Sequence, residues 1–198
     1  MLKITIDTSV FIEDDEAAPR KQAAIRCRQV CENLHREGTI DVAVSTRFEA
    51  DKQNDSDPER VARHFARLQP YRRQSAGFRL DVSRIDVDVL HGEPEDGDII
   101  EELEGLFIAG ISSLRRRVHS MFDADHIWAR WAGKRDYFIT SDVQAVDRLR
   151  SELMRRFGIR VLRPEEFLAA YDEVQDADVD RAQTFAQELE RRHRAGTK

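Results

Sequence analysis

The sequence predicts an α/β fold, a three-layer α/β/α arrangement in which helices cover both faces of a mostly parallel central sheet. Short apolar runs typical of strands recur along the chain, and segments with helical periodicity separate them. This alternation is typical of a parallel sheet. The chain has 198 residues, of which 40% are hydrophobic, so it is long enough for one domain with a substantial core.

The N-terminal segment predicts a strand followed by a long helix. Residues 2–7 alternate apolar and β-branched side chains and stop at Asp7, before a Thr-Ser pair. This pattern indicates a buried strand that ends in a polar loop. Residues 19–37 place apolar side chains along one helical stripe, and Gly38 follows as a helix stop.

The middle of the chain is less regular. A second strand is expected at residues 41–44, and Ser45 is a good N-cap for a following helix that carries Glu49. An Asp-Pro-Glu sequence then begins a short helix that extends to about Leu68. This helix has three arginines at helical spacing, Arg60, Arg63 and Arg67. Beyond it we expect a loop, a strand and a turn-rich connection, at residues 69–77, 78–89 and 91–97. We interpret residues 51–97 as an irregular insertion.

Helices and strands alternate clearly in the C-terminal half. A long amphipathic helix is expected at residues 99–118, and its last turn has three cations that suit the negative end of the helix dipole, Arg115, Arg116 and Arg117. A further helix is expected at residues 123–132. The elements after it are a strand, a helix, a strand and a helix, at residues 136–140, 142–157, 159–162 and 164–171. Residues 1–172 then form a single domain, and residues 173–198 form a peripheral helical tail.

Charge and composition constrain the partners only in part. The net charge of −6 does not exclude a nucleic acid, because a nuclease that binds divalent ions gathers carboxylates in one pocket, where the ions reverse the local charge. The cations are mostly arginine, which binds phosphate with two parallel hydrogen bonds, although a high genomic GC content would produce the same bias. Cys27 and Cys31 are too few and too close for a disulfide framework, so we expect them to be reduced. No apolar run reaches the length of a membrane span, and we expect the protein to be cytoplasmic.

Acidic residues gather where the strands of such a sheet end. Sites in parallel sheets form beyond the carboxyl ends of the strands, and Asp7, Glu49 and Asp142 each follow a predicted strand. Asp123 begins the helix just before one of these strands. Each acid alone has an ordinary interpretation, as a helix N-cap, a loop residue or a solvated side chain. Four carboxylates at one edge would repel each other unless a cation neutralised them, and hard oxygen ligands select Mg²⁺ or Mn²⁺.

Four segments resemble the PIN-domain nuclease family, which includes the VapC-like toxin ribonucleases and related stand-alone proteins. The segment ITIDTSVFI is similar to the opening strand and acidic turn of the family, and STRFEA is similar to its second motif. The segment DADHIWARWAGKRDYFITSD resembles the joined third and fourth motifs and is the most specific match. RVLRPEEFL resembles the final strand and helix. The resemblance spans about residues 1–50 and 120–170 and implies a PIN-like, Rossmann-like fold.

The resemblance also implies an active site and an activity. Asp7, Glu49, Asp123 and Asp142 would be the catalytic, metal-binding acids, with Asp125 as the substitute for Asp123. Ser9 and Ser141 would support the site by hydrogen bonds. The activity would be hydrolysis of RNA phosphodiester bonds with Mg²⁺ or Mn²⁺. The phosphate backbone would be bound by Arg115, Arg116 and Arg117, or by the stripe formed by Arg60, Arg63 and Arg67, although for each set alone a solvated helix face is the favoured interpretation.

The biological role and the rival functions stay open at this point. A toxin of a toxin–antitoxin pair would have an antitoxin protein as partner, whereas an RNA-processing nuclease would not, and a homodimer is expected of either. A non-catalytic RNA-binding or protein-interaction module on the same fold is the alternative. An Asp-nucleophile phosphatase is disfavoured, because its acid/base would be a second Asp two residues after Asp7, where the chain has Ser9.

Overall fold

The computed structural model describes residues 1–11, 19–46, 57–74, 94–175 and 181–196. The chain divides into two compact units. Unit 1 comprises Met1–Ala43 and Arg135–Lys198, and unit 2 comprises Val44–Lys134. Each unit is described by itself below.

A five-stranded parallel sheet organises the chain, which confirms the predicted α/β class. The strand order is β3-β2-β1-β4-β5. The central strand β1 (Leu2–Ile6) pairs in parallel with β4 (Tyr137–Ile139), and β4 pairs in parallel with β5 (Arg160–Leu162). The last three residues of β1 and all of β4 are buried, as expected for strands that are covered on both faces.

The other two strands are β2 and β3. β2 (Ile40–Ser45) begins in unit 1 and ends in unit 2, and β3 (Arg72–Gln74) lies in unit 2. The Thr46 backbone N–H donates to the carbonyl oxygen of Gln74 at 2.8 Å. The expectation of a loop throughout residues 69–77 is therefore wrong at β3. A strand of three residues is too short to show periodicity, and it depends on a partner far away in the sequence.

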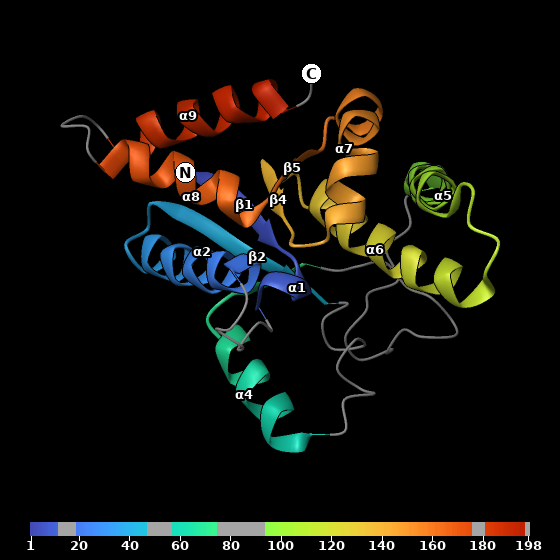
Figure 1. Ribbon diagram of the computed structural model, residues 1–198, viewed down its shortest axis with the longest axis horizontal. Coiled ribbons are helices and arrows are strands. Elements are labelled where there is room, and N and C mark those ends of the chain that lie inside the picture. Colours follow the sequence, from blue (N-terminus) through green and yellow to red (C-terminus); the bar gives the residue numbers. More distant parts are fainter. Residues whose placement is uncertain (12–18, 47–56, 75–93, 176–180, 197–198) are drawn as a thin grey trace. The chain divides into compact units, whose positions relative to one another are not determined.

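Four of the helices of unit 1 follow the predicted order, but the short helix α1 occupies Thr8–Phe11, where a polar loop was expected. The other four are α2 (Pro19–Arg36), α7 (Val143–Phe157), α8 (Pro164–Gln175) and α9 (Arg181–Gly196). In Figure 1, α8 packs against α2, and α9 packs against α8. Gly38 and Gly158 follow α2 and α7 with φ of +72° and +64°, as expected for helix stops.

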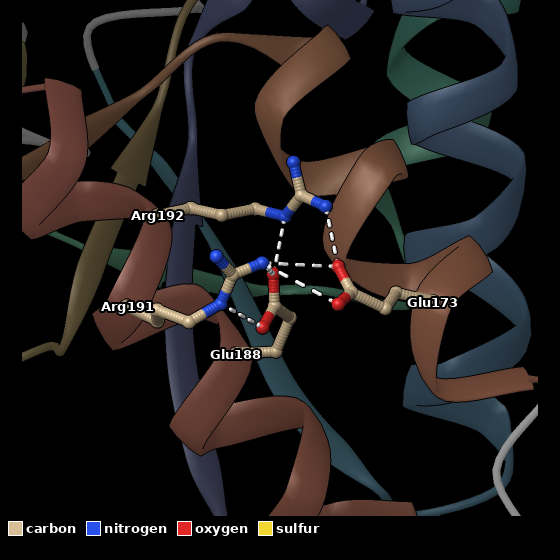
Figure 2. Close-up of polar contacts among 4 residues, drawn as sticks. All are labelled: Glu173, Glu188, Arg191 and Arg192. Carbon is tan, nitrogen blue, oxygen red and sulfur yellow. Dashed lines mark hydrogen bonds and ion pairs between the residues drawn. The ribbon is translucent and has the colours of Figure 1, made fainter.

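The C-terminal helix α9 contributes to the core of unit 1. Phe185, Leu189 and His193 recur every four residues and are at most 3% exposed. The Phe185 ring contacts the ring of Phe167, with the two centroids 5.3 Å apart and the planes nearly perpendicular. Ion pairs also join α9 to α8 (Figure 2), because Arg191 and Arg192 of α9 both pair with Glu173 of α8 as well as with Glu188 of their own helix. The segment that was expected to be a peripheral tail is therefore anchored by both apolar and charged contacts.

A buried arginine joins three strands of the sheet. Arg135 is 3% exposed and lies shortly before β4. Its guanidinium donates to the carboxylate of Asp41 in β2 at 2.9 Å, to the Asp41 carbonyl, and to the Ile4 carbonyl in β1 at 2.9 Å. A guanidinium in a dry interior is tolerated only when its donors and its charge have partners. Here the partners belong to β1 and β2, so Arg135 links these strands to the start of β4.

Unit 2 contains α4 (Pro58–Leu68), α5 (Pro94–Ile108) and α6 (Leu114–Ala132). α4 begins as predicted, because Asp57 caps it by accepting the Arg60 backbone N–H at 3.0 Å. α5 and α6 pack against each other. The predicted helix that carries Glu49 and the predicted strand at residues 78–89 lie outside the described residues.

The predicted boundaries of the helices between residues 91 and 132 are wrong. Helix α5 already begins at Pro94, within the expected turn, and it ends at Ile108 instead of continuing to residue 118. Gly110, with φ of +76°, lies in the break, and α6 then runs without interruption through Asp123. Arg115, Arg116 and Arg117 therefore occupy the first turn of α6, at the positive end of the dipole, and not the last turn of a helix. Both halves of the segment are amphipathic, so periodicity alone did not locate the break.

The pH dependence of stability tests the burial of His193. Burial, followed by the nearby charges of Arg150 and Arg160, lowers the pKa of His193 from 6.5 to about 4. The unfolded chain binds a proton below pH 6.5 that the folded protein excludes, so the free energy of unfolding falls from pH 6.5 to 4 by roughly 3 kcal/mol at most. His193→Gln removes this dependence. Urea unfolding at pH 7.5, 5.5 and 4.5 should show the difference between wild type and variant changing with pH, and a constant difference would contradict the assignment.

Candidate functional site

The candidate site lies where two neighbouring parallel strands end. Asp7 follows β1 directly, and Thr140 follows β4 directly. Because Ile6 pairs with Ile139, these two residues emerge side by side at the carboxyl edge of the sheet. The Asp7 backbone N–H donates to the Ile139 carbonyl at 2.9 Å, which extends the strand pairing into the site. This is the edge at which open parallel sheets bind ligands.

Two hydroxyl groups hold one oxygen of the Asp7 carboxylate. The Ser9 Oγ donates to Asp7 Oδ2 at 2.6 Å, and the Thr140 Oγ1 donates to the same oxygen at 2.7 Å. The two hydroxyl oxygens lie 3.4 Å apart. Asp7 is 9% exposed, and a carboxylate so poorly hydrated needs donors of this kind. The distances are those of charge-assisted hydrogen bonds.

Backbone amides of the loop after β4 fix the direction of both hydroxyls. The Ser141 N–H donates to Ser9 Oγ at 3.1 Å, and the Asp142 N–H donates to Thr140 Oγ1 at 3.0 Å. Each hydroxyl oxygen therefore accepts from an amide, and its own proton is directed to Asp7. The same contacts tie Asp142, which is partly exposed, to the loop that supports Asp7.

Thr140 is the supporting residue that sequence reasoning missed. The resemblance implies that Ser9 and Ser141 both support the site by hydrogen bonds. Ser9 does so with its hydroxyl, but Ser141 contributes its backbone N–H, and its buried Oγ has no hydrogen-bond partner among the described residues. Thr140 supplies the second hydroxyl. The signal in the sequence was its place as the residue after a buried strand, which matches the place of Asp7 after the neighbouring strand.

Of the other predicted acids, only Asp142 belongs to the described part of unit 1. Asp123 and Asp125 lie in unit 2, in the interior of α6. The N-cap interpretation of Asp123 is therefore wrong, because the helix begins nine residues earlier. Asp123 is partly exposed, whereas Asp125 is fully buried. Glu49 lies outside the described residues. Asp142 directly precedes α7, so the N-cap interpretation still applies to it.

The chemistry of Asp7 fits a hard divalent cation. Carboxylate oxygens are the ligands that Mg²⁺ and Mn²⁺ prefer, and hydrogen bonds that orient a ligating carboxylate are a usual support of metal sites. Both hydrogen bonds that Asp7 accepts from hydroxyl groups are accepted by its Oδ2 atom. Within the described residues, no group of three or more His, Cys, Asp or Glu side chains is placed to hold a metal, and a complete ligand set would need acids beyond Asp7 and Asp142.

The predicted phosphate-binding arginines lie at the start of α6. Arg116 and Arg117 are exposed, and the side chain of Arg115 lies outside the described ones. Cations in the first turn of a helix face the positive end of its dipole, which is unfavourable by several tenths of a kcal/mol each. Their presence there does not serve helix stability.

A cavity of about 590 Å³ lies in unit 1, at the opposite ends of the strands. It is lined by the first residues of β1, β4 and β5 and by side chains of α9. Glu190 occupies its polar part, because its carboxylate accepts from the Tyr137 hydroxyl at 3.2 Å and lies 3.2 Å from Arg160 Nε and 3.1 Å from Arg194 Nε. The length of β1, about 16 Å, separates this cavity from Asp7, and its arginines are already neutralised.

Comparisons with protein-family models, with curated proteins and with solved structures gave no match to this chain. No helix in the described ranges is long and apolar enough to cross a membrane.

Replacement of Thr140 by Val tests the hydroxyl support of Asp7. Thr140→Val keeps the shape but removes a donor to a buried carboxylate and an acceptor for the Asp142 N–H, so we expect a loss of about 1–3 kcal/mol in the free energy of unfolding. The matched control is Thr5→Val, because Thr5 is fully buried and its Oγ1 has no hydrogen-bond partner among the described residues. Urea unfolding should show that the control is neutral or stabilised. Equal losses in both variants would contradict the role of Thr140.

Proposed function

We propose that the protein is a metal-dependent endoribonuclease of the PIN type, which hydrolyses RNA phosphodiester bonds at a site that contains Asp7 and Asp142. The observation that supports the proposal is the Asp7 carboxylate, which is held at the carboxyl end of a parallel sheet by two directed hydroxyls. Asp142 lies in the loop that directs one of those hydroxyls. Two of the four sequence segments that resemble the PIN family, ITIDTSVFI and DADHIWARWAGKRDYFITSD, contain these two acids.

The proposed ligand set is Asp7, Glu49, Asp123 and Asp142, with Asp125 in place of Asp123 as the alternative. A Mg²⁺ or Mn²⁺ ion, when bound, would activate the attacking water and offset negative charge on the leaving oxygen. The contribution of the chain itself is preorganisation. Since Ser9 and Thr140 already fix the Asp7 carboxylate, this ligand does not need to reorganise when charge develops.

Substrate binding in this proposal uses the arginines at the start of α6. Arg116 and Arg117 are exposed, and with Arg115 they add to the positive potential of the helix N-terminus. A helix N-terminus attracts phosphate groups through its dipole and its free backbone N–H groups. The unfavourable position of these cations for the isolated helix is consistent with a phosphate backbone as their partner.

Cleavage assays with two active-site variants test the proposal. Asp7→Asn and Asp142→Asn each replace a proposed ligand by an amide of the same shape, so the rate of RNA cleavage with Mn²⁺ or Mg²⁺ should fall on the order of 100-fold. EDTA should abolish cleavage by the wild type. Labelled single-stranded and structured RNAs and DNAs are the substrates, and thermal unfolding checks that each variant is folded.

The matched control for these variants is Asp98→Asn, which makes the same chemical change at an exposed position of α5 and should leave cleavage unchanged. Binding of Mn²⁺ without cleavage of any substrate would overturn the nuclease proposal and favour a binding module. Phosphatase activity that is lost in Asp7→Asn alone would overturn it as well.

A further inference from the structure

The two oxygens of the Asp7 carboxylate have different surroundings. Oδ2 accepts one hydrogen bond from the Ser9 hydroxyl and one from the Thr140 hydroxyl, with oxygen–oxygen distances of 2.6 and 2.7 Å. A carboxylate oxygen offers two lone-pair positions, so these two hydrogen bonds use the acceptor capacity of Oδ2. Neither of them involves Oδ1. A cation that binds Asp7 is therefore directed to Oδ1.

The two hydroxyl groups are held in this orientation by the loop after β4. The Ser9 Oγ accepts the Ser141 N–H at 3.1 Å, and the Thr140 Oγ1 accepts the Asp142 N–H at 3.0 Å. Each hydroxyl has a single proton. Turning that proton away would remove a donor from a carboxylate that is only 9% exposed, which is unfavourable. Two partially positive hydrogens thus stay beside Oδ2, where they repel a cation.

The number of oxygens that a carboxylate offers distinguishes divalent ions. Ca²⁺ takes about six to eight oxygen ligands and often binds both oxygens of one carboxylate, whereas Mg²⁺ requires a nearly ideal octahedron at about 2.0–2.1 Å. Mn²⁺ also favours octahedral sites with oxygen ligands. The two oxygens of one carboxylate lie too close together to occupy two corners of a regular octahedron. A carboxylate that is restricted to one oxygen therefore suits Mg²⁺ and Mn²⁺ and withholds a ligand from Ca²⁺.

We propose that Ser9 and Thr140 make Asp7 a one-oxygen ligand and so select Mg²⁺ or Mn²⁺ over Ca²⁺. This inference rests on the proposed function, in which Asp7 binds the metal. Ser9 and Thr140 are positioning residues, because they contact the carboxylate and act on the ion through it. All four hydrogen bonds that fix Oδ2 lie within the chain, so the selection is built into the folded protein before an ion binds.

Binding of Mn²⁺ and Ca²⁺ to the full chain tests the proposal without a cleavage assay. Mn²⁺ binding is measured by the decrease of the electron paramagnetic resonance signal of the free ion, and Ca²⁺ binding by its competition with Mn²⁺. The variants Ser9→Ala and Thr140→Val each remove one hydroxyl from Oδ2. Loss of a hydrogen-bond partner of a metal ligand lowers affinity by about 10- to 100-fold, so Mn²⁺ should bind at least roughly tenfold more weakly. Ca²⁺ should lose less, because Oδ2 becomes available to it, and the preference for Mn²⁺ should fall on the order of tenfold.

Two control variants separate the hydroxyl contacts from general effects of substitution. Thr140→Ser keeps the hydroxyl and should keep the ion preference of the wild type. Thr5→Val removes a buried hydroxyl of β1 that has no hydrogen-bond partner among the described residues, and it should keep the preference as well. Thermal unfolding checks that each variant is folded. Because Ser9 is partly exposed, Ser9→Ala carries the test if Thr140→Val does not fold.

A crystal structure of the Mn²⁺ complex should show the ion bound to Oδ1 of Asp7 and not to Oδ2. Coordination by both oxygens would overturn the proposal, as would no Mn²⁺ binding by the wild type. Equal weakening of both ions in Ser9→Ala and Thr140→Val would show that the hydroxyls only orient the carboxylate, and would overturn it too.

The outcomes distinguish this inference from the proposed function. Mn²⁺-dependent RNA cleavage together with an unchanged ion preference in the two hydroxyl variants would support the nuclease proposal and contradict the selection by Ser9 and Thr140. A preference for Mn²⁺ that depends on the hydroxyls, in a chain that cuts no RNA, would support the selection and contradict the nuclease proposal.

Discussion

The parallel pairing of β1 with β4 is the constraint on which the candidate site depends. Asp7 and Thr140 are 133 residues apart in the chain, and only the register of Ile6 with Ile139 brings them side by side. A slip of one residue would turn every side chain of the strand to the opposite face. Arg135 lies just before β4 and supports the register from the opposite end of this strand pair. Its guanidinium donates to the Ile4 carbonyl of β1 and to the Asp41 carboxylate of β2.

Once the register is set, the hydrogen bonds at the strand ends leave little freedom. The two loop amides direct two hydroxyls, and the hydroxyls direct one carboxylate. A buried carboxylate without such donors would be unfavourable by several kcal/mol, so the network stabilises the fold whatever the function. Its functional significance lies in the result, an acid of fixed orientation at the sheet edge where ligands bind.

Arginine serves two different uses in this chain. In unit 1, arginines connect secondary-structure elements. Examples are the network between α8 and α9 (Figure 2) and the contacts of Arg135 with the neighbouring strands. In unit 2, Arg63 and Arg116 are exposed and form no ion pair within the described residues. Arginine content alone could not distinguish these two uses, because the same residue type serves internal cohesion in one place and faces solvent in the other.

The sequence by itself determined the fold class, most strands and the stops at Gly38 and Gly158, because periodicity and helix stops are local properties. It also located Asp7 and Ser9 at a strand end. Only the tertiary structure decided that Thr140 supports Asp7, that the helix breaks near Gly110, and that α9 packs into the core. The physical reason is that the contacts of Thr140 and of α9 depend on partners distant in the sequence, which strand pairing and helix packing select, whereas the break near Gly110 lies between two segments of the same periodicity.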